Sequence, residues 1–171
     1  MIISLIGYRA TGKSTVGKNL ASELARPFYD SDQFITEAAG KSIAEIFSEQ
    51  GEDEFRLLES EAVTKLMQMK DAVIAWGGGV VLKKTNRSEI RRSHRTIWLQ
   101  ASAENIFERM YADSNSQQSR PPLTDLGPMQ EIQSNLEKRD KLYRECADLT
   151  IETNNLSVEE IVEQILNGLE T

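Results

Sequence analysis

The chain has 171 residues, a length that suits one compact domain and is short for two. It is 39% hydrophobic, carries a formal net charge of −7, and has no apolar stretch long enough to cross a bilayer. We therefore expect no nucleic-acid partner, which would need a broad basic surface, and no membrane partner.

The amino-terminal residues lack the basic leader and cleavage site of a signal peptide, and Cys146 is the only cysteine. An internal disulfide is thereby ruled out, and a reducing compartment is favoured. We expect a cytoplasmic protein in which Cys146 is an inert, partly buried thiol.

Short apolar runs alternate with amphipathic stretches along the chain. The apolar runs predict strands at residues 1–6, 27–29, 72–76, 96–99 and 148–152. Spacings of three and four predict helices at about 16–25, 34–40, 42–47, 55–66, 103–111, 129–145 and 157–169. This order predicts an α/β fold of three layers, in which helices flank a mostly parallel sheet of about five strands, as a single domain over residues 1–171.

A phosphate-binding pattern follows the first predicted strand. Residues 7–14 read Gly-Tyr-Arg-Ala-Thr-Gly-Lys-Ser, which is glycine, four residues, then Gly-Lys-Ser between a strand and a helix. Backbone amides at the start of the helix would hold phosphates, Lys13 would approach the β and γ groups, and Ser14 would reach Mg²⁺. The segment is therefore predicted to bind a nucleoside triphosphate with one Mg²⁺ ion; the alternative is a glycine-containing turn. The binding residues would be Gly7, Arg9, Ala10, Thr11, Gly12, Lys13, Ser14 and Thr15.

Two further patterns follow predicted strands and should lie at the same edge of the sheet. Asp30 and Asp32 are two residues apart, so in extended chain both would face the phosphates, one toward the metal and the other toward the attacking group. The alternative is a pair of helix-capping residues. Residues 77–79 are three glycines, which favour a close approach of backbone to ligand.

The rest of the chain narrows the class of nucleotide-binding protein. A GTPase would carry Asn-Lys-x-Asp, which is absent, and a motor would usually be larger, with a strand ending in a metal-binding Asp. The length fits a small-molecule kinase.

Seven motifs in order resemble the shikimate kinase family over nearly the whole chain. They are the phosphate loop at residues 7–15, Asp30-Ser31-Asp32, Ser-Ile-Ala-Glu-Ile-Phe at 42–47, Glu54-Phe55-Arg56 with Glu59, the glycines with Val80, Arg120-Pro121, and Lys138-Arg139 with Leu142-Tyr143. The resemblance implies transfer of the ATP γ-phosphoryl group to the 3-hydroxyl of shikimate, giving shikimate 3-phosphate on the route to chorismate and the aromatic amino acids. It also implies ATP and shikimate as the only partners of a monomer.

The resemblance further implies roles for individual residues. Lys13, Asp32 and Arg120 would be catalytic, with Asp32 the hydroxyl partner and base and Arg120 in a lid at about residues 112–125. Asp30 would reach Mg²⁺ through water, and Arg109 would lie against the adenine. Within an acceptor region that includes residues 31–62, shikimate would be bound by Asp32, Phe55, Arg56, Gly77, Gly78, Gly79 and Arg139. Glu59, three residues after Arg56 on the helix, would orient that guanidinium.

Several alternatives stay open. Arg56, Arg109 and Arg139 could instead be solvated helix charges, and residues 112–128, which are polar and lack an apolar period, could be disordered. A kinase of another polyol acid such as gluconate would lack the arginine pair, and a non-catalytic module would bind ATP without turnover. The chain departs from the family pattern at Arg9, Ala10, Pro122 and Lys141.

Overall fold

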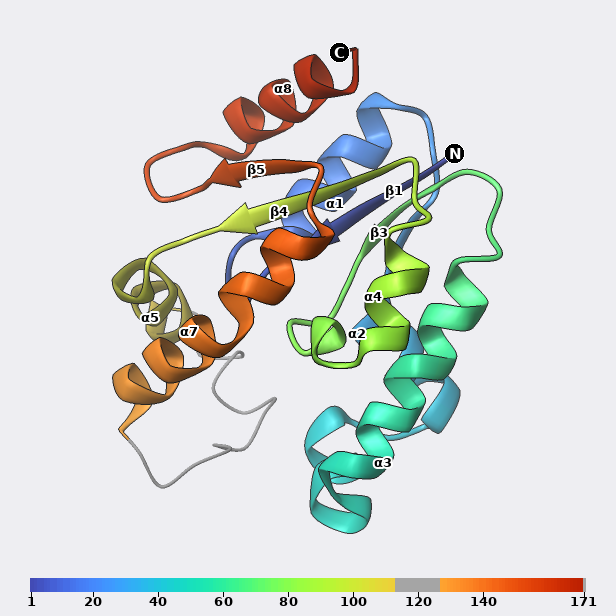
Figure 1. The fold of residues 1–171 in the computed structure, drawn as a ribbon, viewed down its shortest axis with the longest axis vertical. Helices are drawn as coiled ribbons and strands as arrows, with labels where there is room; N and C mark the ends of the chain where they lie inside the picture. Colours follow the sequence, from blue (N-terminus) through green and yellow to red (C-terminus); the bar gives the residue numbers. More distant parts are fainter. Residues whose placement is uncertain (113–126, 171) are drawn as a thin grey trace.

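The structure is a computed structural model that describes residues 1–112 and 127–170. Within these residues one parallel five-stranded sheet has the strand order β2-β3-β1-β4-β5 (Figure 1). The strands are β1 (Ile2–Ile6), β2 (Phe28–Asp30), β3 (Ala72–Ala75), β4 (Arg95–Gln100) and β5 (Leu149–Glu152). The predicted fold class is confirmed, and every strand runs in the same direction.

The helices alternate with the strands as expected for a parallel sheet. They are α1 (Lys13–Glu23), α2 (Ser31–Ala39), α3 (Ile43–Leu66), α4 (Lys84–Ile90), α5 (Ala103–Ala112), α7 (Pro128–Cys146) and α8 (Val158–Leu169), with a short 3₁₀ helix at Val80–Leu82. Two of them begin with a capping box, in which Ser42 caps α3 and Ser157 caps α8. No described helix is both long and apolar enough to cross a membrane.

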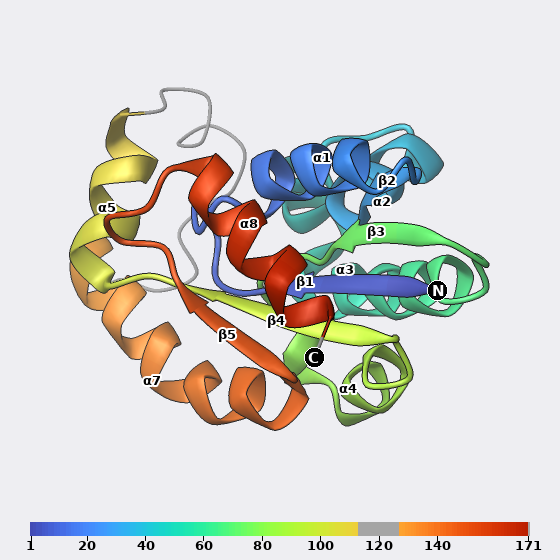
Figure 2. The same cartoon turned by 90° about the horizontal axis from the view of Figure 1, so that it is seen from above.

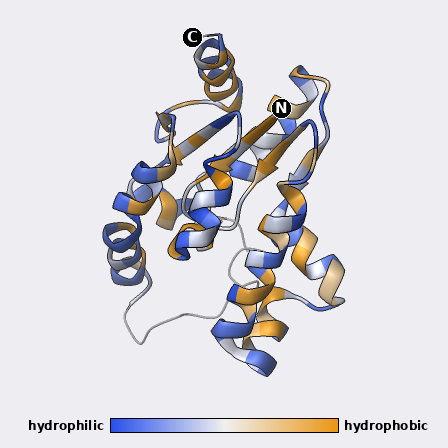
Figure 3. Cartoon of the chain, turned by 45° about the vertical axis from the view of Figure 1, so that its right-hand side comes forward, coloured by the Kyte–Doolittle hydropathy of each residue, from blue (hydrophilic) through white to orange (hydrophobic). Residues whose placement is uncertain are grey.

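Side chains of β1 alternate between the two faces of the sheet and so define the layers. Ile3 and Leu5 pack with apolar residues of α1 and α8, whereas Ile2 and Ile6 pack with those of α3, α4 and α7. Figure 2 shows α1 and α8 together on one side of β1 and β4. Figure 3 shows mainly hydrophobic strands between helices in which hydrophobic and hydrophilic residues are mixed. The result is a helix–sheet–helix sandwich with its core on both faces of the strands.

One helix differs from the sequence prediction, and another has a kink where the sequence predicts a break. α4 was not predicted, because only Asn86 and Ile90 of its seven residues are buried, which leaves no apolar repeat to detect. α3 contains both helical segments that the sequence predicts, one before and one after Gly51, and a kink at Gly51 separates them, with φ of 84° and ψ of 175°. Glycine tolerates this non-helical conformation, so the predicted break between the two segments is confirmed.

The strand order places β1 at the point where the chain switches sides of the sheet. β2 and β3 lie on one side of β1, and β4 and β5 lie on the other. Open parallel sheets bind ligands beyond the carboxyl ends of their strands at such a point. The segment that follows β1 is the predicted phosphate loop, which therefore occupies the expected ligand-binding position.

Candidate active site

The phosphate loop between β1 and α1 has backbone angles that few residues adopt. Gly7 and Gly12 have φ of 145° and 92°, and a Cβ on Gly7 would lie 2.3 Å from the carbonyl oxygen of Leu99. Glycine is therefore required at Gly7. Gly12 caps α1 and supplies no side-chain acceptor, so the first amides of this helix can bind phosphate oxygens.

Ala10 occupies a left-handed position in this loop. Its φ is 59°, a region in which an alanine is about 1–2 kcal/mol less stable than in its usual conformations. Glycine would adopt this conformation without the same cost. The loop thus keeps its shape at Ala10 at the expense of local strain.

Lys13 and Ser14 lie in the first turn of α1 and face the loop and β2. The Lys13 ammonium donates to the carbonyl oxygens of Gly7 and Tyr8 at 2.8 and 2.7 Å. The Ser14 hydroxyl donates to Oδ2 of Asp30 at 2.5 Å. The loop therefore brings an ammonium, a hydroxyl and a carboxylate to one place, which is the donor set suited to a metal-bound triphosphate.

Other residues of the loop are tied to the body of the protein. The Thr11 hydroxyl donates to the Tyr8 carbonyl at 2.8 Å, and Arg9 forms a 3.4 Å ion pair with the buried Glu131 at the start of α7. Thr15 follows on the exposed side of α1. The Thr11 hydrogen bond thus braces the loop internally, and the Arg9 ion pair connects the loop to α7.

Asp30 and Asp32 do not share an extended strand, contrary to the prediction. β2 ends at Asp30 and α2 begins at Ser31, so Asp32 lies in the first helical turn. Oδ1 of Asp30 accepts from the amides of Asp32 and Gln33 at 3.0 and 3.4 Å, which makes Asp30 the helix cap. Because its other oxygen accepts from Ser14, Asp30 both caps α2 and faces the phosphate loop.

The three glycines after β3 provide space rather than unusual backbone angles. A Cβ on Gly77 would lie 2.6 Å from Oδ1 of Asp32, and one on Gly79 would lie 2.1 Å from Nη1 of Arg56. A methyl group at either position would have to displace the end of that side chain. The expected close approach at Gly77 and Gly79 is thus made by side chains of the same chain.

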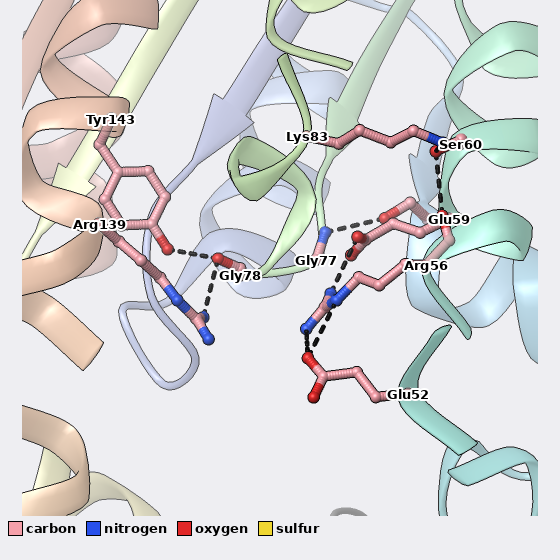
Figure 4. A network of polar contacts seen from close by, with 10 residues as sticks. Glu52, Arg56, Glu59, Ser60, Gly77, Gly78, Lys83, Arg139 and Tyr143 are labelled. Atoms are coloured by element: carbon pink, nitrogen blue, oxygen red, sulfur yellow. Dashed lines mark hydrogen bonds and ion pairs between the residues drawn. The ribbon is translucent and has the colours of Figure 1, made fainter. Parts of the chain in front are cut away.

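Arg56 is only partly exposed, so the solvated-charge alternative does not hold. Its side chain is 19% exposed, Nη1 donates to the buried Glu59 at 2.9 Å, and Nη2 donates to Glu52 at 3.1 Å (Figure 4). Burial lowers the pKa of Arg56, but the two carboxylates outweigh it and the pKa is raised. The predicted orienting contact of Glu59 is present.

Phe55 precedes Arg56 and lies in the cluster between α2 and α3. Phe55 is 2% exposed, its ring packs in a tilted arrangement against Phe47 with centroids 4.8 Å apart, and the Arg56 guanidinium lies 5.5 Å from its ring centre. Packing of Phe55 thereby supports Arg56.

Arg139 is also buried, at 7% exposure, rather than on the outer face of α7. Its Nη1 donates to the carbonyl oxygen of Gly78 at 3.1 Å, and its guanidinium lies 5.4 Å from the ring centre of Tyr8 (Figure 4). The Tyr143 hydroxyl donates to the same carbonyl at 2.5 Å. Arg56 and Arg139 therefore approach the three glycines from α3 and from α7.

Arg109 is half-buried near the phosphate loop. It donates to the Ala10 carbonyl at 3.3 Å and to the Thr153 carbonyl at 2.7 Å. It therefore links the loop to the chain that leaves β5. Arg120 and Pro122, with the predicted lid from residue 113 onward, lie outside the described residues.

Sequence reasoning missed three residues that shape this site. The Ser31 hydroxyl accepts from the Gly77 amide at 2.8 Å, and Tyr8 and Tyr143 flank Arg139. The Asp-Ser-Asp pattern contains Ser31, and Tyr143 lies one helical turn after Arg139. Neither pattern indicates that the hydrogen-bond partners are backbone groups of the three glycines.

The residues around Ser14 suit Mg²⁺ rather than a metal held by protein alone. In the part of the chain that the structure describes, no three His, Cys, Asp or Glu residues gather closely enough to hold a metal ion. Mg²⁺ normally keeps several waters and binds one or two protein oxygens together with substrate phosphates. Ser14 and Asp30 fit this requirement.

A parallel sheet with this loop after its first strand defines a P-loop nucleotide-binding protein, and similarity to known proteins identifies it as a P-loop kinase. Residues 9–170 match the family described as shikimate kinase. The chain is 41% identical over 164 residues to the shikimate kinase of Rhodopirellula baltica, covering 96% of this chain and 88% of that protein. The shikimate kinase of Caldanaerobacter subterraneus is 40% identical over 166 residues, covering 97% and 94%. The chain belongs to the shikimate kinase family.

Solved structures agree with this assignment. A shikimate kinase from Acinetobacter baumannii in complex with shikimate superposes with a TM-score of 0.93 at 35% identity, covering 99% of this chain and 92% of that one. A gluconokinase from Sinorhizobium meliloti superposes with a TM-score of 0.60 at 19% identity, covering 98% and 90%. The gluconokinase shares the fold, which leaves the acceptor to be argued from the site.

Proposed function

We propose that this chain transfers the γ-phosphoryl group of ATP to the 3-hydroxyl of shikimate, giving ADP and shikimate 3-phosphate. The observation that carries the proposal is the pair Arg56 and Arg139, which approach the three glycines from opposite helices. Two guanidinium groups favour a carboxylate, and the neighbouring Asp32 suits a hydroxyl of the same acceptor. Shikimate carries both groups.

The transfer needs the acceptor hydroxyl in line with the γ-phosphorus. The hydroxyl oxygen forms a bond to phosphorus, the bond from phosphorus to the β–γ bridging oxygen breaks, and ADP leaves with that electron pair. The hydroxyl proton passes to a carboxylate or to solvent. Asp32 is the group we assign to orient the hydroxyl and accept the proton, and Gly77–Gly79 line the acceptor pocket beside it.

Lys13 and the amides of the phosphate loop would bind the β and γ phosphates. The Lys13 ammonium donates hydrogen bonds to the Gly7 and Tyr8 carbonyl oxygens, so it already lies within the loop that would surround those phosphates. When bound, Mg²⁺ neutralises charge on the phosphates, and Ser14 and Asp30 would hold it, Asp30 through water. Arg109 would lie against the adenine, since it adjoins the loop at Ala10.

The acceptor is tested with purified protein in an assay that couples ADP release to NADH oxidation. We expect turnover with shikimate and none above background with gluconate or nucleoside monophosphates. Shikimate methyl ester retains the hydroxyls and lacks the carboxylate, so it should show a strongly raised KM if the arginine pair binds that group. Turnover with gluconate but not with shikimate would overturn the assignment.

We also propose that the protein acts on these small molecules as a cytoplasmic monomer, with residues 1–171 as one kinase domain. Support comes from the acidic composition and from Cys146, whose thiol is buried. Light scattering at working concentrations tests the oligomeric state, and a mass of about 19.3 kDa is expected. A dimer mass would contradict it.

A further inference from the structure

The carbonyl oxygen of Gly78 is the shared acceptor of two donors from α7. Arg139 Nη1 donates to it at 3.1 Å and Tyr143 Oη donates at 2.5 Å (Figure 4). The two donors are four residues apart and so lie one above the other on the same face of the helix. A single backbone carbonyl in the glycine segment thereby joins the acceptor-binding arginine to a tyrosine that the proposed function does not use.

Tyr143 is rigidly held. Its side chain has no exposed surface, and its ring stacks on Trp98 of β4 with centroids 5.6 Å apart. Burial raises the pKa of Tyr143, and the nearby Arg139, which acts in the opposite direction, does not offset it. The phenol therefore stays protonated at working pH and always donates.

Arg139 is anchored to the same carbonyl. Its Nη1 donates to the Gly78 carbonyl, its guanidinium lies 5.4 Å from the Tyr8 ring centre, and its charge lowers the pKa of the neighbouring Tyr143. The guanidinium carries several more N–H groups, which suit a carboxylate. The direction in which Arg139 presents them depends on where the Gly78 carbonyl points.

The Gly78 backbone also lies beside the phosphate loop, with no room for a freely packed side chain between them. A Cβ there would lie 3.2 Å from the Arg9 nitrogen and 3.4 Å from the Gly7 carbonyl oxygen. A small rotation of the Gly78 peptide would move the carbonyl oxygen to which Arg139 is hydrogen-bonded. It would also change the packing of Gly78 against the phosphate loop. A second donor on this carbonyl opposes such a rotation.

We propose that Tyr143 is a positioning residue for the acceptor: its hydroxyl fixes the Gly78 carbonyl, and the carbonyl fixes the Arg139 guanidinium. The inference rests on the proposed function, because it gives Arg139 an acceptor carboxylate to bind. It predicts an effect of Tyr143 on acceptor binding without contact between Tyr143 and the acceptor.

The test is Tyr143→Phe, which removes one oxygen and keeps the stacked ring. We expect the KM for shikimate to rise about three- to tenfold, the effect of one hydrogen bond, with the KM for ATP and kcat changed less than about twofold. The matched control is Thr96→Val, which removes a buried hydroxyl that donates to the Ile90 carbonyl at 3.3 Å, near the amino end of β4 and away from the glycines. The control should lower Tm and leave both KM values unchanged.

A double-mutant cycle tests whether Tyr143 affects acceptor binding through Arg139. If Tyr143 acts through Arg139, Tyr143→Phe should change the KM for shikimate less than about twofold in an Arg139→Lys background, so the two effects are not additive. Additive effects, or an unchanged KM in Tyr143→Phe itself, would overturn the inference while wild-type turnover still supports the function. Absence of wild-type turnover with shikimate would instead overturn the proposed function, and the inference with it.

Discussion

The Ser14 hydroxyl lies 2.5 Å from Oδ2 of Asp30, so the first turn of α1 is bonded to the residue that ends β2 and caps α2. β2 and β1 are not neighbours in the sheet, because β3 lies between them. The hydrogen bond therefore spans the strand ends where the triphosphate would lie. The hydrogen bond already holds the Ser14 and Asp30 oxygens close together. A metal ion bound by these two oxygens and the phosphates would take the place of this hydrogen bond.

Asp30→Asn tests this pairing. Asparagine keeps an oxygen to cap α2 and loses the negative charge, so we expect the Mg²⁺ concentration for half-maximal rate to rise about tenfold, with a smaller loss of kcat at saturating Mg²⁺. The rate is measured against free Mg²⁺ at fixed ATP. Ser157→Ala, which removes the cap of α8, is the control for loss of helix stability. If the Mg²⁺ concentration for half-maximal rate were unchanged in Asp30→Asn, Asp30 would not be part of the metal site.

Lys13→Ala should abolish most turnover. Lys13 is the ammonium held within the phosphate loop, and loss of one donor to a transferring group typically lowers the rate about a hundredfold or more. Steady-state kinetics with ATP and shikimate measure the loss. Lys18→Ala changes an exposed lysine of the same helix and should remain within about twofold of wild type. Similar small effects from both variants would contradict the role of Lys13.

The strand ends and the loop could be predicted from the sequence because their signals are local. A continuous apolar run such as Ala72–Ala75 marks a buried strand, and the spacing of Gly7, Gly12 and Lys13 fits one loop geometry. Because the strands are parallel, the segments that follow their carboxyl ends all lie at the same edge of the sheet. α4 could not be predicted in this way, because its sequence has almost no apolar repeat.

The partners of the site residues could not be predicted, because they depend on contacts between distant segments. The three glycines indicate that space is needed, but only the fold shows Asp32 at Gly77 and Arg56 at Gly79. The helical start at Ser31 follows a local signal, the Asp30 cap, which the sequence offered as the alternative to extended chain. The hydrogen bond from the Gly77 amide to the Ser31 hydroxyl, 46 residues away, could not be predicted.

Gly79→Ala tests the space at the glycines. The φ of Gly79 is −93°, which alanine adopts readily, so the added methyl group would act by displacing the Arg56 guanidinium, not by straining the backbone. We expect the KM for shikimate to rise about tenfold, with the KM for ATP little changed. Gly127→Ala is the control, because φ there is −59° and no described atom lies within 4 Å of the added carbon. Equal KM values in both variants would show that Arg56 does not bind the acceptor.

Asp32→Asn separates catalysis from nucleotide binding. The amide keeps the size of the carboxylate and cannot accept a proton, so kcat should fall about ten- to a hundredfold while the KM for ATP changes little. Asp53→Asn alters an exposed carboxylate of α3 and serves as the control. If Asp32→Asn retained full turnover, phosphoryl transfer would proceed by positioning and charge stabilisation without this carboxylate.

Cys146 should be unreactive in the folded protein. Its side chain is 3% exposed, and burial raises its pKa to about 11, so at pH 8 only about one thiol in a thousand is ionised. An unfolded cysteine, with a pKa of about 8.5, is ionised in about a quarter of molecules at that pH.

We therefore expect native Cys146 to react with Ellman's reagent at least a hundredfold more slowly than in guanidinium chloride. Because the raised pKa lies above the tested range, the native rate should rise about tenfold from pH 8 to pH 9, whereas the unfolded rate rises only about threefold. A fast native reaction would contradict the burial of the thiol. Full kinase activity after exposure of the native protein to N-ethylmaleimide would show that turnover needs no accessible thiol, as expected if the chemistry depends on the phosphate loop, Asp32 and the two guanidinium groups.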